Sequence, residues 1–207
     1  MGLLAAPLAI VRAHRRVYLR LNLAYFGLIL VGLAWAQIDR GLAGRLRAAV
    51  DASLSGGSLA PVARVYDSGA VLAAIIVTLG LNLFVGSLAS ITLPSLVLPF
   101  SGLAVAGLRA FAWGLLFSPE PAAITLRNFP AGAVIAGLLF LEGQGYVLTM
   151  LAAWIHSRAR TQPATVGAAS RREGSRAGLR STAQLYLLVI LTLAIAAIYE
   201  VWAATLA

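Results

Sequence analysis

Two charged side chains lie deep within long apolar stretches of this sequence, and they are the first candidates for chemistry. Arg109 is near the centre of one stretch and Glu142 is central in the next. If the stretches cross a membrane, each charge costs about 2.5–3.5 kcal/mol on insertion scales, so its retention needs a reason. Opposite charges at similar depth on consecutive helices are expected to pair, because pairing limits their desolvation. The pair then acts either as a structural staple or as a proton or ion relay.

Four further polar residues could extend this pair: Asn82, Gln144, Tyr146 and Glu200. Tyr146 shares a helical face with Glu142, whereas Gln144 points almost oppositely and is expected to meet another helix or to mark a second polar contact. Glu200 is near the end of the last apolar stretch, where a long side chain can reach water.

A stripe of small residues borders Arg109. Its members recur every fourth residue and are Gly102, Ala106, Ala110 and Gly114. Small residues allow helix backbones to approach closely within a membrane. We expect this stripe to bring the helix that carries Arg109 against the helix that carries Glu142.

Other kinds of chemistry have little support in the sequence. There is no cysteine, which excludes disulfides, thiolate metal sites and cysteine nucleophiles. No zinc, phosphate-binding or catalytic-triad motif is present, so no enzymatic activity is expected. His14 and His156 lie beside arginines at the ends of apolar stretches, as solvent-facing residues commonly do. Their use as haem or pigment ligands is a further alternative, and the sequence identifies no cofactor.

The composition is that of a protein dissolved in lipid. Hydrophobic residues make up 60% of the 207 and charged residues 11%, with a mean hydropathy of +0.89; soluble domains have about 45–50% and 25%. All 16 basic residues are Arg. Because most of them flank apolar stretches, they indicate orientation in a membrane rather than binding to nucleic acid.

The elements that must position the polar residues follow from length, since a crossing needs about 17–25 apolar residues. The sequence predicts an all-α, polytopic membrane protein with about five transmembrane helices in a single domain. The predicted spans are residues 21–37, 69–91, 96–117, 130–154 and 183–204. The second and third come from one long stretch that Pro94 and Pro99 are expected to break.

Three segments outside the spans also have a predicted structure. Residues 3–11 are too short to cross and are expected to form an interfacial helix. Residues 42–54 carry leucine and valine at every fourth position, which predicts a short amphipathic helix on the membrane or on the protein itself. Residues 157–181 are polar, contain six arginines and lack apolar periodicity, so a mobile cytoplasmic loop is expected.

Orientation follows from the arginines. Four before the first span and six in residues 157–181 make ten on one side, against five on the other: Arg40, Arg45, Arg47, Arg64 and Arg127. The positive-inside rule therefore places the N-terminus and residues 157–181 in the cytoplasm. With five crossings, the C-terminal Ala207 is outside.

Three stretches carry a family resemblance. They are RAHRRVYLRLNLAYFGLILVGLAWA, VYDSGAVLAAIIVTLGLNLFVGSLASITLPSLVLPFSGLAVAG and LEGQGYVLTMLAAW. In them the chain resembles the stage II sporulation protein M family of five-span membrane proteins. The resemblance implies a bacterial or archaeal cell membrane, and either peptidoglycan-remodelling machinery or an ATP-driven exporter as partner. Where that family often has Pro-His-Gly and then Glu, this chain has Pro130, Ala131 and Gly132 followed by Ile135. Glu142, about two turns further along, is the candidate to replace the missing acid.

These observations favour a non-catalytic subunit or scaffold of a larger membrane complex. The expected partners are the lipid bilayer and other membrane subunits, without nucleic acid. The alternative is a membrane component of a transporter with an intramembrane polar site. Polar groups that satisfy one another, with no cavity reaching them, favour the subunit, whereas a continuous polar cavity favours transport.

Overall fold

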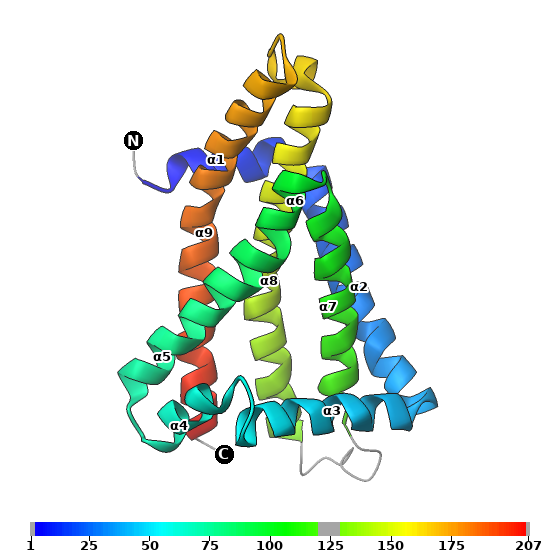
Figure 1. The fold of residues 1–207 in the computed structure, drawn as a ribbon, viewed down its shortest axis with the longest axis vertical. Helices are drawn as coiled ribbons and strands as arrows, with labels where there is room; N and C mark the ends of the chain where they lie inside the picture. Colours follow the sequence, from blue (N-terminus) through cyan, green and yellow to red (C-terminus); the bar gives the residue numbers. More distant parts are fainter. Residues whose placement is uncertain (1–2, 120–128, 206–207) are drawn as a thin grey trace.

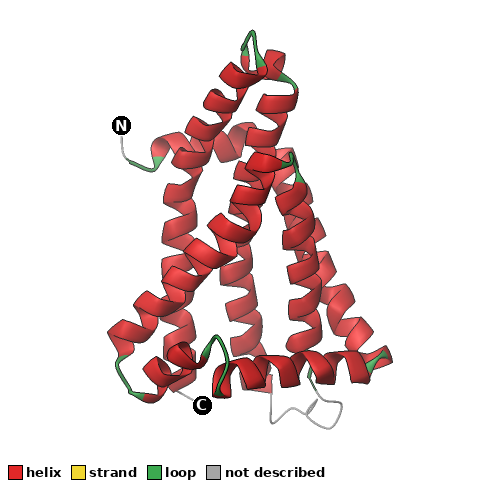
Figure 2. Cartoon of the chain, viewed as in Figure 1, coloured by secondary structure: helices red, strands yellow, loops and turns green. Residues whose placement is uncertain are grey.

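The computed structural model describes residues 3–119 and 129–205, and the secondary structure of this part of the chain is entirely helical (Figure 2). The long helices run roughly lengthwise, and shorter helices lie across both ends of the bundle (Figure 1). The all-α fold class is therefore confirmed.

Four helices within the described ranges are long and apolar enough to cross a membrane: Arg15–Ile38, Val71–Val97, Gly132–Thr161 and Arg171–Ala204. The first, third and fourth are α2 (Arg15–Ile38), α8 (Phe129–Thr161) and α9 (Arg171–Thr205). The second is continuous over three elements, which are α5 (Val71–Gly80), η1 (Leu81–Thr92) and α6 (Leu93–Val97). The remaining apolar helix, α7 (Ser101–Leu116), has 16 residues. At 1.5 Å per residue it is about 24 Å long, shorter than the hydrocarbon core of about 30 Å.

Helix α8 is the centre of the bundle. In its apolar window 56% of the residues are buried, against 22–28% for the other three long helices. It packs along α9 on one side and contacts α2, η1 and α7 on the others (Figure 1). The outer faces of the surrounding helices expose large apolar side chains such as Leu23, Leu72 and Leu108. Polar residues on α8 are therefore placed where helices from several parts of the chain converge.

The long apolar stretch is a helical hairpin, but its break lies later than expected. The helix continues through Pro94 to Val97, and the turn falls at residues 98–100, where Phe100 has a φ of 68°. Pro94 lies at the first positions of α6, where the preceding π-helix gives way to an α-helix. The helix break expected between residues 91 and 96 therefore lies at residues 98–100 instead.

The π-helix η1 turns more widely than an α-helix, because its hydrogen bonds run from i to i+5. Its buried positions follow that wider turn: Asn82, Gly86, Ser87, Ile91 and Thr92. In an α-helix, which turns by about 100° per residue, residues spaced in this way would not all lie on one face toward α8. The π-helix therefore keeps Ile91 and Thr92 on the same buried face as Asn82 and Gly86.

The amphipathic helix predicted at 42–54 is confirmed as α3 (Arg40–Ser55), which Asp39 caps by accepting from the Leu42 N–H at 2.9 Å. Its first half packs on the protein, since Leu42 and Leu46 contact the ends of α2 and α7. Arg47 reinforces this contact by donating to the Leu116 carbonyl at 3.1 Å and to the Ser118 carbonyl. A further short helix, α4 (Ala60–Asp67), follows α3 and was not expected.

Residues 157–181 are not the expected loop. Helix α8 continues to Thr161, a short 3₁₀ turn covers Pro163–Val166, and α9 begins at Arg171. The two helices pack so closely at Gly174 that no side chain fits there, since a Cβ on this residue would lie 2.0 Å from the Ala159 carbonyl oxygen. Small residues and backbone packing therefore extend the hairpin through a sequence without apolar periodicity.

The N-terminal helix is confirmed as α1 (Ala5–Ala13). It lies crosswise to the long helices and contacts α9 (Figure 1). Arg127, one of the arginines used to predict the orientation, lies outside the described residues, and so does Ala207. The side chains of Pro130 and Ala131, used in the family resemblance, are also outside the described part of the structure.

Candidate functional site

A chain of hydrogen bonds joins Arg109 to Glu142 through two other side chains. Arg109 donates to the Tyr146 hydroxyl at 2.7 Å, and that hydroxyl donates to Asn82 Oδ1 at 2.9 Å. The Asn82 amide in turn donates to Glu142 Oε1. Each bond runs in the same direction, from cation to carboxylate, and bonds aligned in this way polarise one another.

The pair expected from the sequence is therefore indirect. Among the described residues, Arg109 and Glu142 form no ion pair with each other, because Tyr146 and Asn82 occupy the space between them. The network links α7, α8 and η1, three elements that are separate in the sequence. Asn82 and Tyr146 are thus linking members of the network rather than supporting residues at its edge.

Aromatic rings hold the Arg109 guanidinium in place. Its Cζ lies 4.2 Å from the centre of the Tyr146 ring and 5.1 Å from that of Trp113. Such cation–π contacts compensate part of the hydration that an arginine loses inside a bundle. Gly86 makes room for the contact, since a Cβ there would lie 2.7 Å from Arg109 Nη1 and 2.8 Å from the Tyr146 hydroxyl.

The small-residue stripe is buried along its whole length, but it packs on other helices than expected. A Cβ on Gly102 would lie 1.8 Å from the Ile91 carbonyl of η1, and a Cβ on Gly114 would lie 2.1 Å from the Ile29 carbonyl of α2. The stripe therefore brings α7 against η1 and α2. Arg109 and Trp113 of α7 both contact Tyr146 of α8.

Gln144 forms the second polar contact that its position predicted. Its Oε1 accepts from the Tyr18 hydroxyl at 2.6 Å, and its amide donates to Asn22 Oδ1 at 2.7 Å. This contact joins α8 to α2 on the side away from Glu142. The spacing of Tyr18 and Asn22, four residues apart on one helical face, was the available sequence signal for it.

Glu200 provides a second carboxylate beside that of Glu142. Its Oε1 accepts from the Tyr66 hydroxyl of α4 at 3.1 Å, and Tyr66 also shares a 2.6 Å hydrogen bond with Thr78. Burial raises the pKa of Tyr66 to about 12, so this hydroxyl remains a donor at neutral pH. No sequence signal linked Tyr66 or Thr78 to Glu200, because α4 was not expected.

A cavity of about 300 Å³ lies between these two carboxylates and the helices around them. Its polar lining comes from Thr78, Asn82, Glu142 and Glu200. The rest of its wall is apolar or aromatic and is formed by Leu59, Val62, Leu81, Trp113, Leu116, Phe117 and Leu138. The cavity thus reaches the end of the hydrogen-bonded chain from the side where α3 and α4 lie.

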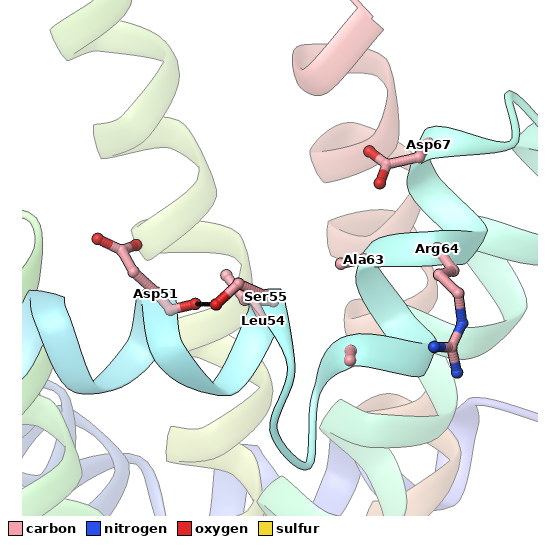
Figure 3. A pocket seen from close by; sticks show the side chains of 7 residues that line it. Asp51, Leu54, Ser55, Ala63, Arg64 and Asp67 are labelled. Atoms are coloured by element: carbon pink, nitrogen blue, oxygen red, sulfur yellow. Dashed lines mark hydrogen bonds between the residues drawn. The ribbon is translucent and has the colours of Figure 1, made fainter.

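A larger cleft of about 450 Å³ opens between α3 and α4, but its charged residues do not converge. Asp51 and Asp67 point in different directions, and the Arg64 guanidinium points away from both (Figure 3). This cleft lacks the convergent polar groups of a binding site.

The two histidines are engaged by the protein. His14 Nδ1 lies 3.0 Å from the Ile10 carbonyl, and His156 is buried with Nε2 3.0 Å from the Ser175 hydroxyl. No group of three or more His, Asp or Glu residues within 3–119 and 129–205 is arranged to hold a metal ion.

Comparisons with protein families, curated proteins and solved structures find no match to this chain.

Proposed function

We propose that this chain is a polytopic membrane protein with five crossings, its N-terminus in the cytoplasm of a bacterial or archaeal cell. Four helices with suitable length and composition support this, together with the apolar side chains that they expose. The fifth crossing is α7 (Ser101–Leu116), which packs along α2. The ten-to-five division of arginines supports the orientation.

Labelling of single cysteines tests this topology, and the cysteine-free sequence makes it clean. Thr165 and Ala48 are both exposed, and they lie at opposite ends of the bundle. In sealed right-side-out vesicles, an impermeant maleimide is expected to label Ala48→Cys at once and Thr165→Cys only after lysis. Labelling of Thr165→Cys in intact vesicles contradicts the orientation.

Within that membrane, the function that we propose is a non-catalytic subunit or scaffold of a larger complex, similar to the stage II sporulation protein M family. The supporting observation is that hydrogen bonds between polar side chains inside the bundle join several of its helices. Arg109, Tyr146, Asn82 and Glu142 form one chain, and Gln144 forms a separate contact with α2. These bonds tie α2, η1, α7 and α8 into one body, as a scaffold requires.

Extraction of the tagged chain from its native membrane in lipid nanodiscs tests this function. If the chain is a subunit, its nanodisc particle is expected to be much larger in size-exclusion chromatography than a nanodisc holding one 21.6 kDa chain. The particle should also contain at least one other membrane protein in a fixed ratio to this chain. The same chain overproduced without its partners is the control and should shift to the smaller size. A native particle that contains this chain alone contradicts the proposal.

The second candidate is a membrane component of a transporter, and the cavity that reaches Asn82 and Glu142 supports it. Transport needs access to this site from both sides in turn. Cysteines placed at Leu138 and at Ser87 distinguish the candidates, because a transporter is expected to expose Leu138→Cys and Ser87→Cys to opposite sides under substrate or energy supply. Accessibility that stays unchanged under all conditions favours the scaffold.

A further inference from the structure

The cavity beside Glu142 contains two carboxylates, and among the described residues no cation forms a direct ion pair with either of them. Glu142 is 5% exposed, and its only hydrogen bond joins Oε1 to Asn82, so Oε2 is unpaired within this part of the chain. Glu200, on the facing helix α9, accepts only from the neutral Tyr66 hydroxyl. Both residues line the same cavity.

The nearest buried cation is directed elsewhere. The Arg109 guanidinium donates to Tyr146 and lies over the rings of Tyr146 and Trp113, with Asn82 between it and Glu142. Two carboxylates facing one largely apolar cavity are costly unless a positive charge or protons accompany them. The arrangement therefore has the electrostatic character of a cation site.

The remaining lining determines what kind of cation fits. Seven of the eleven lining residues are apolar or aromatic, including Leu81, Trp113 and Leu138, and they enclose about 300 Å³. A bare metal ion would leave most of that space without a hydrogen-bonding partner. An organic ammonium group donates to carboxylate and amide oxygens through its N–H groups, while its carbon body covers the apolar wall. The volume is at the lower limit for ligand pockets, so that body is small.

We propose that this cavity binds a small primary amine in its protonated form, with the ammonium group between Glu142 and Glu200. Thr78 and Asn82 line the same cavity. The body of the amine, a single ring or short alkyl chain, lies against Val62, Leu81 and Leu138. This site goes beyond the scaffold function and does not depend on it, because binding requires no translocation.

Equilibrium dialysis of radiolabelled benzylammonium against the full chain in lipid nanodiscs tests the proposal, with empty nanodiscs subtracted. We expect saturable binding to the unmodified chain. Glu142→Gln and Glu200→Gln are each expected to weaken it by about tenfold or more, because each removes one ion pair. Glu173→Gln changes an exposed carboxylate at the other end of α9 and is expected to leave binding unchanged.

Two further measurements separate recognition of the charge from partition of the probe into the bilayer. Benzyl alcohol, which has the same ring without the charge, is expected to compete about tenfold less well or worse. Val62→Trp fills the cavity from α4 while leaving both carboxylates intact, and it is expected to abolish binding even if a carboxylate variant fails to fold. The proposal is overturned by absent saturation, by a smaller loss in either folded carboxylate variant, by equal competition from the alcohol, or by undiminished binding in Val62→Trp.

Discussion

Gly114→Ala is expected to destabilise the protein by about 3 kcal/mol or more, because the added Cβ meets backbone rather than a movable side chain. It would lie 2.1 Å from the Ile29 carbonyl and 2.8 Å from the Gly32 Cα. Neither can yield without a separation of α2 from α7. Thermal unfolding in a mild detergent, followed by circular dichroism or by tryptophan fluorescence, measures the loss.

Gly27→Ala is the matched control for this change. Gly27 is also on α2, but a Cβ there would meet nothing within 4 Å. Its replacement should leave stability unchanged or raise it slightly, since alanine is the better helix former. Gly32→Ala, whose Cβ would lie 2.2 Å from the Phe111 carbonyl, should match Gly114→Ala. If Gly114→Ala unfolds at the same temperature as Gly27→Ala, the close contact between α2 and α7 is wrong.

Arg109→Leu and Glu142→Leu are each expected to destabilise the protein by about 3–5 kcal/mol, since each leaves the other charge buried without its compensation. The double change should recover much of that loss, because it removes both charges. The midpoint of thermal unfolding of all four proteins gives the coupling between the two positions. Arg45→Leu is the control, because Arg45 is exposed on α3.

The hydrogen-bonded chain makes this prediction more specific. Tyr146→Phe keeps the ring beneath Arg109 but removes the hydroxyl that passes the interaction to Asn82. By itself it should cost about 1–3 kcal/mol, because buried partners lose a hydrogen bond. In this background the coupling between Arg109 and Glu142 should largely disappear. If the coupling between Arg109 and Glu142 is unchanged in Tyr146→Phe, the two charges interact by another route. If the effects of Arg109→Leu and Glu142→Leu simply add when Tyr146 is present, the two charges do not interact.

The helices themselves were predictable to a large extent, because lipid leaves a chain few alternatives. Backbone groups in hydrocarbon must bond within their own segment, so a long apolar stretch indicates a helix. Apolar content indicates only the apolar part of each helix, however. Helices α2, α8 and α9 extend beyond the predicted spans into polar sequence, and the hairpin over residues 157–181 depends on the close approach of Gly174 to α8.

The members of the candidate site were also visible one by one, because a polar residue in an apolar stretch is conspicuous. Asn82, Arg109, Glu142 and Tyr146 were all identified in this way. Their connection was not, since depth along a helix says nothing about rotation around it. Asn82 of η1 is buried against α8 and donates to Glu142, and it thereby occupies the position opposite Glu142 that a direct ion pair needs.

Composition and periodicity thus determined the helical class, the approximate number of long helices and the polar residues buried among them. The tertiary structure alone decided which of those residues meet. It placed the unexpected helix α4 beside α9, so that Tyr66 bonds Glu200 and Val62 closes the wall of a cavity that also contains Glu142. The physical reason is that hydrophobicity acts along each segment without direction, whereas hydrogen bonds and backbone contacts between segments depend on register, rotation and the exact positions of single glycines.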